Sequence, residues 1–236
     1  MKKKMNGTSL TSLYLVLGIA AQALYRWLYT YLEDEVSYLL PRGTLPEILL
    51  WILTAAAIAG AFLLTRNTSW QPSGKVITVM CDALFAFGIA SLLLENAKGP
   101  GILVLLYRIF CCIAALSLAA SAVMHGLGKK VPFVLEVCPC VLCLLHLLIC
   151  YQLWSEVPQL MNYVMGLGAV LCLALTTYFH MAYEADLPEK AWYHGVMLLG
   201  VYFCCAASAQ EEFPVFFSAA AVWLVGNSMS IQCAEE

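Results

Sequence analysis

Charged side chains are scarce in this sequence. Only 11% of its 236 residues are Asp, Glu, Lys or Arg, whereas about 25% is typical of a soluble domain. Hydrophobic residues make up 62%, and apolar runs recur along the whole chain. Runs of about 18 or more apolar residues are long enough to cross a lipid bilayer as helices. The composition therefore excludes an ordinary soluble domain and predicts an integral membrane protein in contact with the lipid bilayer.

Basic clusters and common catalytic motifs are also lacking. The net charge is -3 and the longest run of basic residues is Lys2, Lys3 and Lys4, so nucleic acid is not an expected partner. The sequence contains no HExxH motif, no nucleotide-binding Gly-Lys-Ser/Thr loop and no Gly-x-Ser-x-Gly elbow. We therefore expect neither an enzyme nor a bound cofactor.

The apolar runs predict an all-α transmembrane bundle that forms a single domain over residues 1–236. A helix of about 20 residues crosses the hydrocarbon core once. Counting in such lengths gives eight spans, near residues 10–32, 45–65, 75–94, 101–124, 132–153, 159–183, 189–209 and 213–231. The first span also imitates a signal peptide, because basic residues precede it and Ala21-Gln22-Ala23 suits cleavage. Its apolar stretch continues to Leu32, which favours a retained helix.

The loops between these spans differ in charge. Cytoplasmic loops of membrane proteins collect Lys and Arg. With the N-terminus inside, the inner segments hold eight such residues and the outer ones two, namely Arg42 and Lys98; the inner ones are Lys2, Lys3, Lys4, Arg66, Lys75, Lys129, Lys130 and Lys190. This bias predicts a multi-pass protein of the bacterial cytoplasmic (inner) membrane with both termini in the cytoplasm.

A few ionisable residues fall inside the predicted spans. Asp82, Glu136 and His180 all lie in the cytoplasmic third of their spans or just beyond it, as do His125 and His194. Charged groups in a bilayer are costly, usually face the protein interior and often mark ion or proton paths. Asp82, Glu136 and His180 are therefore candidates for a transport path. The alternative is structural, since a histidine near the interface forms local hydrogen bonds at little cost.

Two arginines lie in the outer third of their predicted spans. Arg26 and Arg108 carry long side chains that can reach toward water or pair with acidic residues at the outer loops. We expect structural ion pairs with Glu33, Asp34, Glu35 or Glu95. The alternative is an outer charge site at which the two arginines attract an anion.

Most of the 11 cysteines lie within apolar runs and are expected to be small buried hydrophobes. One group, Cys138, Cys140 and Cys143 with His146, has donors suited to Cu(I) or zinc. Cys138-Pro139-Cys140 resembles the ion-binding motif of heavy-metal P-type ATPases, which implies metal ligation, but the chain has none of the soluble domains of such pumps. Packing of these cysteines in the apolar helix is the favoured alternative.

The second half of the chain carries a broader resemblance. Pro158-Gln159-Leu160, Tyr178-Phe179 and Ala221-Val222-Trp223-Leu224 are similar to segments of a group of uncharacterised polytopic bacterial membrane proteins. The resemblance implies a helical membrane bundle and brings no activity or site with it.

Two functional hypotheses remain open. The first is a carrier or permease component for a small solute or ion, with Asp82, Glu136 and His180 along its path. The second is a non-catalytic scaffold or sensing partner of another membrane protein, in which the buried polar groups only hold helices together. The sequence slightly favours transport, and soft-metal binding is a lesser alternative.

Overall fold

The computed structural model describes most of the chain. The described residues are 7–29, 43–66, 68–70, 74–95, 101–154, 163–187, 192–209, 213–229 and 231–233. They form eight helices: α1 (Gly7–Tyr29), α2 (Leu45–Leu64), α3 (Lys75–Ser91), α4 (Gly101–Gly126), α5 (Phe133–Trp154), α6 (Val164–Glu184), α7 (Trp192–Ala207) and α8 (Pro214–Ser228). The all-α prediction is confirmed, and each helix falls on one predicted span.

Five of these helices are long and apolar enough to cross a membrane. They are α1, α2, α4, α5 and α6, whereas α7 and α8 are apolar but shorter. At about 1.5 Å per residue, the 16 residues of α7 and the 15 of α8 span less than the hydrocarbon core of about 30 Å. The last predicted span is wrong at its end, because α8 stops at Ser228 and Ile231–Cys233 forms a strand.

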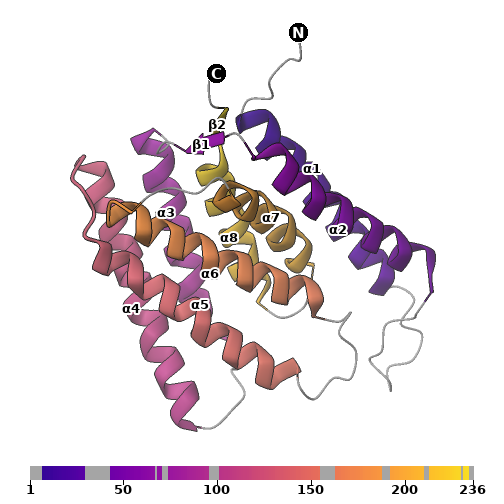
Figure 1. Cartoon of the computed structure of the whole chain (residues 1–236). Coiled ribbons are helices and arrows are strands. Elements are labelled where there is room, and N and C mark those ends of the chain that lie inside the picture. Colours follow the sequence, from indigo (N-terminus) through magenta and orange to yellow (C-terminus); the bar gives the residue numbers. More distant parts are fainter. Residues whose placement is uncertain are drawn as a thin grey trace.

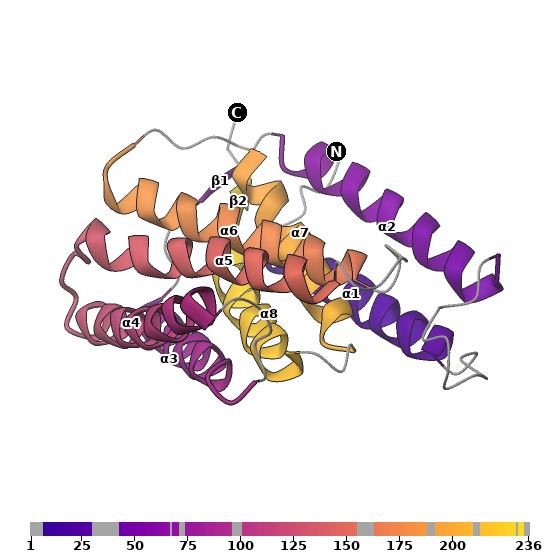
Figure 2. The same cartoon turned by 90° about the horizontal axis from the view of Figure 1, so that it is seen from below.

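Six helices are arranged as a closed ring. Going around it, α3 packs on α4, α4 on α5, α5 on α6, α6 on α7, α7 on α8, and α8 again on α3. Helices α1 and α2 form a pair outside the ring that packs on α7, and they lie together at one side of the molecule in Figures 1 and 2. Side chains from the ring helices fill its interior.

Helix α7 is central, and the other helices present apolar surface outward. Every residue from Tyr193 to Ala207 is buried, because α1, α2, α6 and α8 all pack against this helix. In contrast, Leu63 on α2, Ile102 on α4 and Leu116 on α4 are each more than 70% exposed. Soluble monomers rarely expose such extensive apolar surface, whereas lipid requires it.

Glycines bring α3 and α8 close together. A Cβ atom added at Gly88 of α3 would overlap Ala219, and one added at Gly226 of α8 would overlap the Cys81 side chain. Small residues at helix contacts permit this close backbone approach. As a result, polar side chains on α3 are within reach of those on α8.

Two short strands close one end of the bundle. β1 (Thr68–Trp70) follows α2 and pairs antiparallel with β2 (Ile231–Cys233) after α8. The Thr68 hydroxyl is 2.6 Å from Nδ1 of His194, a fully buried residue of α7. Gly7, at the start of α1, also lies against the backbone of Ile231. The start of α1 and the end of α8 are therefore at the same end of the bundle (Figure 1).

Candidate functional site

A polar cavity lies at the end of the bundle where α3 and α5 begin and where α4, α6 and α8 finish. Its volume is about 250 Å³. The side chains around it come from every ring helix except α7 and from the α4–α5 connection. We call this the polar cavity; it is lined by Lys75, Thr78, Asp82, His125, Gly128, Lys129, Lys130, Glu136, His180, Tyr183, Glu184, Trp223 and Asn227.

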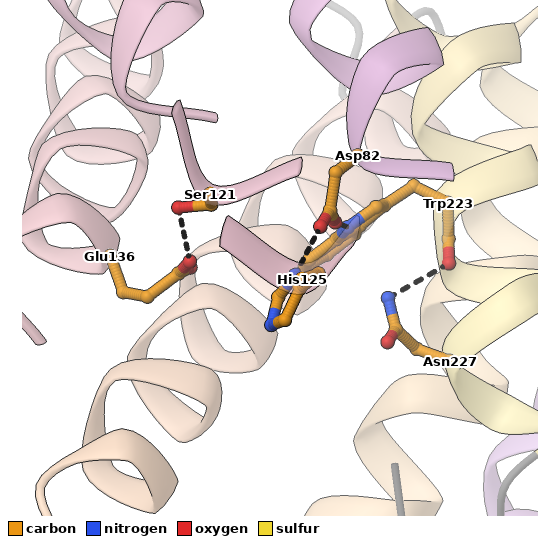
Figure 3. Close-up of polar contacts among 6 residues, drawn as sticks. All are labelled: Asp82, Ser121, His125, Glu136, Trp223 and Asn227. Atoms are coloured by element: carbon orange, nitrogen blue, oxygen red, sulfur yellow. Dashed lines mark hydrogen bonds and ion pairs between the residues drawn. The ribbon is translucent and has the colours of Figure 1, made fainter. Parts of the chain in front are cut away.

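Asp82 is held by hydrogen bonds to both of its oxygens. Oδ2 is 2.9 Å from Nδ1 of His125, and Nε1 of Trp223 donates to Oδ1 at 3.0 Å. The side chain lies about two turns into α3 and is 6% exposed. Asp82 thus connects α3 with α4 and α8 (Figure 3). Each oxygen of this carboxyl group therefore has a hydrogen-bond partner.

Glu136 is different, because only one of its oxygens is used. The Ser121 hydroxyl donates to Oε1 at 3.0 Å, and within the described part of the chain this is the only hydrogen bond of the Glu136 side chain. The residue is 6% exposed and lines the polar cavity. His125 lies within electrostatic reach of both Glu136 and Asp82, and Figure 3 shows it between them.

His180 joins this group from α6. Its ring centroid is 5.1 Å from that of Trp223 and 6.0 Å from that of Phe179. The structure therefore places Asp82, Glu136 and His180, the residues predicted to line a transport path, around one cavity. Their role in transport remains a prediction.

The mouth of the cavity is basic. Lys75, Lys129 and Lys130 line it, and Glu184 lies beside them. Nζ of Lys130 donates to Oδ2 of Asp186 at 2.7 Å, and this hydrogen bond raises the pKa of the lysine. Lys75 and Lys129 form no ion pair with any other residue that the structure describes. Two of the three lysines therefore have no direct ion-pair partner among the described residues, and with Glu184 as the acid beside them the mouth keeps a positive balance.

Several lining residues were not predicted as site residues from the sequence. Lys75 and Lys129 served only to orient the chain, and Trp223 belonged only to a broad resemblance. The signal that could have found Trp223 is its indole N–H, since a buried indole normally needs an acceptor and the acids within the spans are few. Lys75 and Lys129 could have been found from their positions, because they lie directly beside the ends of the spans that carry Asp82 and Glu136.

The predicted metal ligands do not converge. Helix α5 continues through Pro139, and the thiols of Cys138 and Cys140 lie near different backbone oxygens, Val134 O at 3.7 Å and Ala174 O at 3.9 Å. Within the described residues no group of three His, Cys, Asp or Glu side chains is placed to hold a metal ion. Cys143 is buried, and His146 instead contacts Cys150, with Nε2 3.5 Å from Sγ.

His146 belongs to a second, fully buried polar group in the other half of the ring. Its Nδ1 is 2.7 Å from the Tyr107 hydroxyl, and its ring centroid lies 4.9 Å from those of both Phe213 and Phe216. Phe217 completes the surroundings at 6.4 Å. His146 is fully buried. We call these five residues the His146 cluster; the polar cavity does not include them.

The two arginines are exposed at the sides of the bundle. Arg26 lies on α1 and Arg108 on α4, and the ion pairs among the described residues do not include either of them. Pairing of either arginine with Glu95 is therefore absent from the described structure. Glu33, Asp34 and Glu35 lie outside the described residues, so pairing of either arginine with one of these acids stays a prediction. Arg26 also borders a groove with Leu84 and Phe87 of α3.

Comparisons of the chain with protein-family models, with curated proteins and with solved structures find no match.

Proposed function

We propose that the protein is a carrier for a small solute or ion, and that the polar cavity is its binding site. The observation that carries this proposal is Glu136, a buried carboxyl group with an unused acceptor oxygen inside a cavity that also contains Asp82 and His180. Ionisable groups at membrane depth are rare, and they usually take part in binding a substrate or in moving ions or protons. Here they come from separate helices and meet at one place.

In this proposal all eight helices cross the bacterial cytoplasmic membrane and the cavity faces the cytoplasm. The support is the basic mouth, because Lys75, Lys129 and Lys130 lie at this end and cytoplasmic ends are rich in lysine. The start of α1 and the end of α8 share this end, which agrees with both termini inside. The short helices α3, α7 and α8 would then depend on their neighbours for full depth in the bilayer.

The orientation is tested by thiol labelling from each side of the membrane. Lys129→Cys should react with a membrane-impermeant maleimide in inverted vesicles and not in intact cells. Glu95→Cys, just beyond the other end of α3, is the matched position and should react in the opposite way. Labelling of Lys129→Cys in intact cells would place the cavity on the outer side and contradict this topology.

Aromatic side chains pack between the cavity and the His146 cluster. The ring of Phe85 stacks on Trp223 at 4.7 Å and lies 6.1 Å from Phe216, which in turn packs on His146. A site open at one end and sealed at the other is what one state of an alternating-access carrier requires. Transport would need these aromatic side chains to separate.

Flux measurements on reconstituted protein test the proposal. Detergent-purified protein is first screened for thermal stabilisation by monovalent and divalent cations, small amines, carboxylates and zwitterions, because a solute that binds the folded state raises its apparent stability. Stabilising solutes are then followed in proteoliposomes. We expect Glu136→Gln and Asp82→Asn to abolish uptake, whereas Asp186→Asn, an exposed acid outside the cavity, leaves it intact. Wild-type flux in both cavity variants would contradict the polar cavity as the binding site, and absence of flux of every stabilising solute in the wild-type protein would contradict a carrier function.

One observation favours the scaffold or sensing partner instead. Both Asp82 oxygens are used within the protein, as expected of a buried group whose task is to hold helices together. Crosslinking in native membranes would then recover a second membrane protein in constant ratio. Recovery of only this chain, together with solute flux, would decide for the carrier.

A further inference from the structure

We propose that the polar cavity selects a small zwitterion, with an ammonium group on Glu136 and an acidic group turned toward Lys75 and Lys129. The inference deepens the carrier function proposed above, since it names the class of solute for the same site. It depends on the hydrogen-bond balance of the acids, on the separation of charge within the cavity, and on its size.

The inner part of the cavity needs a donor. A carboxylate oxygen that faces a cavity and has no protein partner can accept from a bound group, and a charged donor forms a stronger hydrogen bond with it than a neutral one. Asp82 is already bonded to His125 and Trp223, so of the two acids in the inner part of the cavity Glu136 is the one with an unused acceptor oxygen. An ammonium group brings three N–H donors and the opposite charge to this position.

The mouth of the cavity has the opposite character. Lys130 is compensated by Asp186. Lys75 and Lys129 have no ion-pair partner in the described part of the chain and both line the cavity, where Glu184 is the one acid beside them among the described lining residues. The lysines therefore leave the mouth with a positive balance. A simple cation would be attracted by Glu136 and repelled at the mouth, and a simple anion would experience the reverse. A solute that carries both charges matches both parts, and complementary charge of this kind determines specificity.

Size restricts the solute further. The volume of about 250 Å³ lies below the range of about 300–1,000 Å³ that is usual for drug-sized ligands. An outer hollow of about 420 Å³ shares His125, Lys129, Lys130, Tyr183 and Glu184 with it, so the limit applies to the part of the solute that lies against Glu136. The smaller volume equals the space of about eight water molecules at about 30 Å³ each. Trp223, Tyr183 and His180 supply aromatic surface along the wall, which suits a short apolar linker between the two charges. The solute is therefore of amino-acid size.

The experiment compares solutes that differ in charge and in the distance between their charges. Glycine, β-alanine and γ-aminobutyrate are zwitterions of increasing length, and propylamine and propionate carry one charge each. We expect at least one zwitterion to raise the thermal midpoint of the purified protein and to bind in calorimetry, with both single-charge solutes weaker by about 10-fold or more in Kd. A charged hydrogen bond typically contributes a factor of about 10 or more to binding.

Matched variants locate the two charges. Glu136→Gln should weaken the best zwitterion by about 10-fold or more while Glu95→Gln, at the other end of the bundle, leaves its Kd unchanged. Lys129→Gln should weaken the zwitterion but not propylamine, whereas Lys130→Gln, already neutralised by Asp186, should have a smaller effect. Circular dichroism and elution volume in size-exclusion chromatography confirm that each variant is folded.

Three results would overturn the inference. The first is that none of the three zwitterions stabilises the protein, and the second is that propylamine binds as tightly as the best zwitterion. The third is that both Glu136→Gln and Lys129→Gln bind the zwitterion like the wild type. In that case the lysines only determine the orientation of the chain in the membrane. These results are separable from a failure of the carrier function. Flux of another solute that depends on Asp82 would keep the carrier and refute the zwitterion, whereas zwitterion binding without flux would do the reverse.

Discussion

The polar cavity and the His146 cluster are both built from a histidine, aromatic rings and hydrogen bonds inside the same ring of helices, but they differ in access and in charge. The cavity opens at one end of the bundle, and the side chain of its His125 is 28% exposed. His146 is fully buried, and Tyr107 is its hydroxyl partner. The cavity also contains carboxyl groups, which the cluster lacks.

This difference shows which buried polar groups indicate a binding site. A histidine such as His146, whose nitrogens contact Tyr107 and Cys150, can be explained entirely by packing. Glu136 cannot, because part of its hydrogen-bonding capacity is directed to no protein group in the described structure. The useful criterion is therefore unused capacity together with access, and the presence of a polar residue in an apolar helix is not sufficient.

The largest expected effect on stability is in the His146 cluster. Phe216 is 1% exposed and packs on both Phe85 and His146. Phe216→Ala leaves a cavity in the sealed half of the ring and should lower the free energy of unfolding by about 3 kcal/mol. SDS titration of the protein in detergent micelles measures it. Phe87→Ala, at a position 66% exposed on α3, is the control and should stay within about 0.5 kcal/mol.

An equal loss of unfolding free energy in Phe216→Ala and Phe87→Ala would contradict the difference between the His146 cluster and the cavity. Such a result would show that the cluster is not tightly packed. The His146 region would then be as accessible as the cavity, and the comparison between the two regions would be wrong.

The next effect concerns Asp82 in the cavity. Asp82→Asn keeps an acceptor for the Trp223 indole but replaces the charged partner of His125. A hydrogen bond to a charged group contributes about 1.5–3 kcal/mol, so we expect a loss of about 1–2 kcal/mol in the same titration. Asp186→Asn, in an exposed pair, should show no measurable change. An unchanged stability of Asp82→Asn would mean that Asp82 does not hold α3, α4 and α8 together.

A smaller effect is expected for the polar contact of the His146 cluster. Tyr107→Phe removes the hydroxyl group 2.7 Å from Nδ1 of His146 and leaves the ring in place. Hydrogen bonds between membrane helices contribute about 0.6 kcal/mol on average, and we expect a loss of about that size. Tyr151→Phe, at an exposed position, controls for loss of a hydroxyl. A loss of several kcal/mol would show that polar bonding, and not aromatic packing, holds the cluster.

The sequence predicted the helices well because hydrophobic length is a local property. Each of the eight helices overlaps one predicted span, with ends that differ by up to five residues. After α8, residues 231–233 form a strand that pairs with β1. Strand pairing between residues 68–70 and 231–233 depends on contacts distant in the sequence, which apolar run length does not encode. The ring arrangement likewise depends on glycine contacts such as that of Gly88 with Ala219.

The candidate site was predicted only in part. The cost of ionisable groups in lipid singled out Asp82 and Glu136, and the shared position of their helix ends grouped them with His180. The sequence could not distinguish Asp82, bonded on both oxygens, from Glu136, bonded on one, because this depends on where Trp223 and Ser121 lie. The Cys138 and His146 ligand set, which the sequence offered only as a lesser alternative to packing, does not converge because the two residues face different neighbours along α5.

The smallest effect on stability is expected at Glu136, although it is the residue on which binding depends most. Glu136→Gln retains an oxygen that accepts from Ser121, and the other oxygen has no partner in the described structure to lose. The free energy of unfolding should therefore change by less than about 0.5 kcal/mol or rise slightly, since residues kept for function are often not optimal for stability. Titration without added solute measures this change. If Glu136→Gln destabilises the protein as much as Asp82→Asn does, Glu136 has a structural role like that of Asp82, and the cavity loses the unused group that separates it from the His146 cluster.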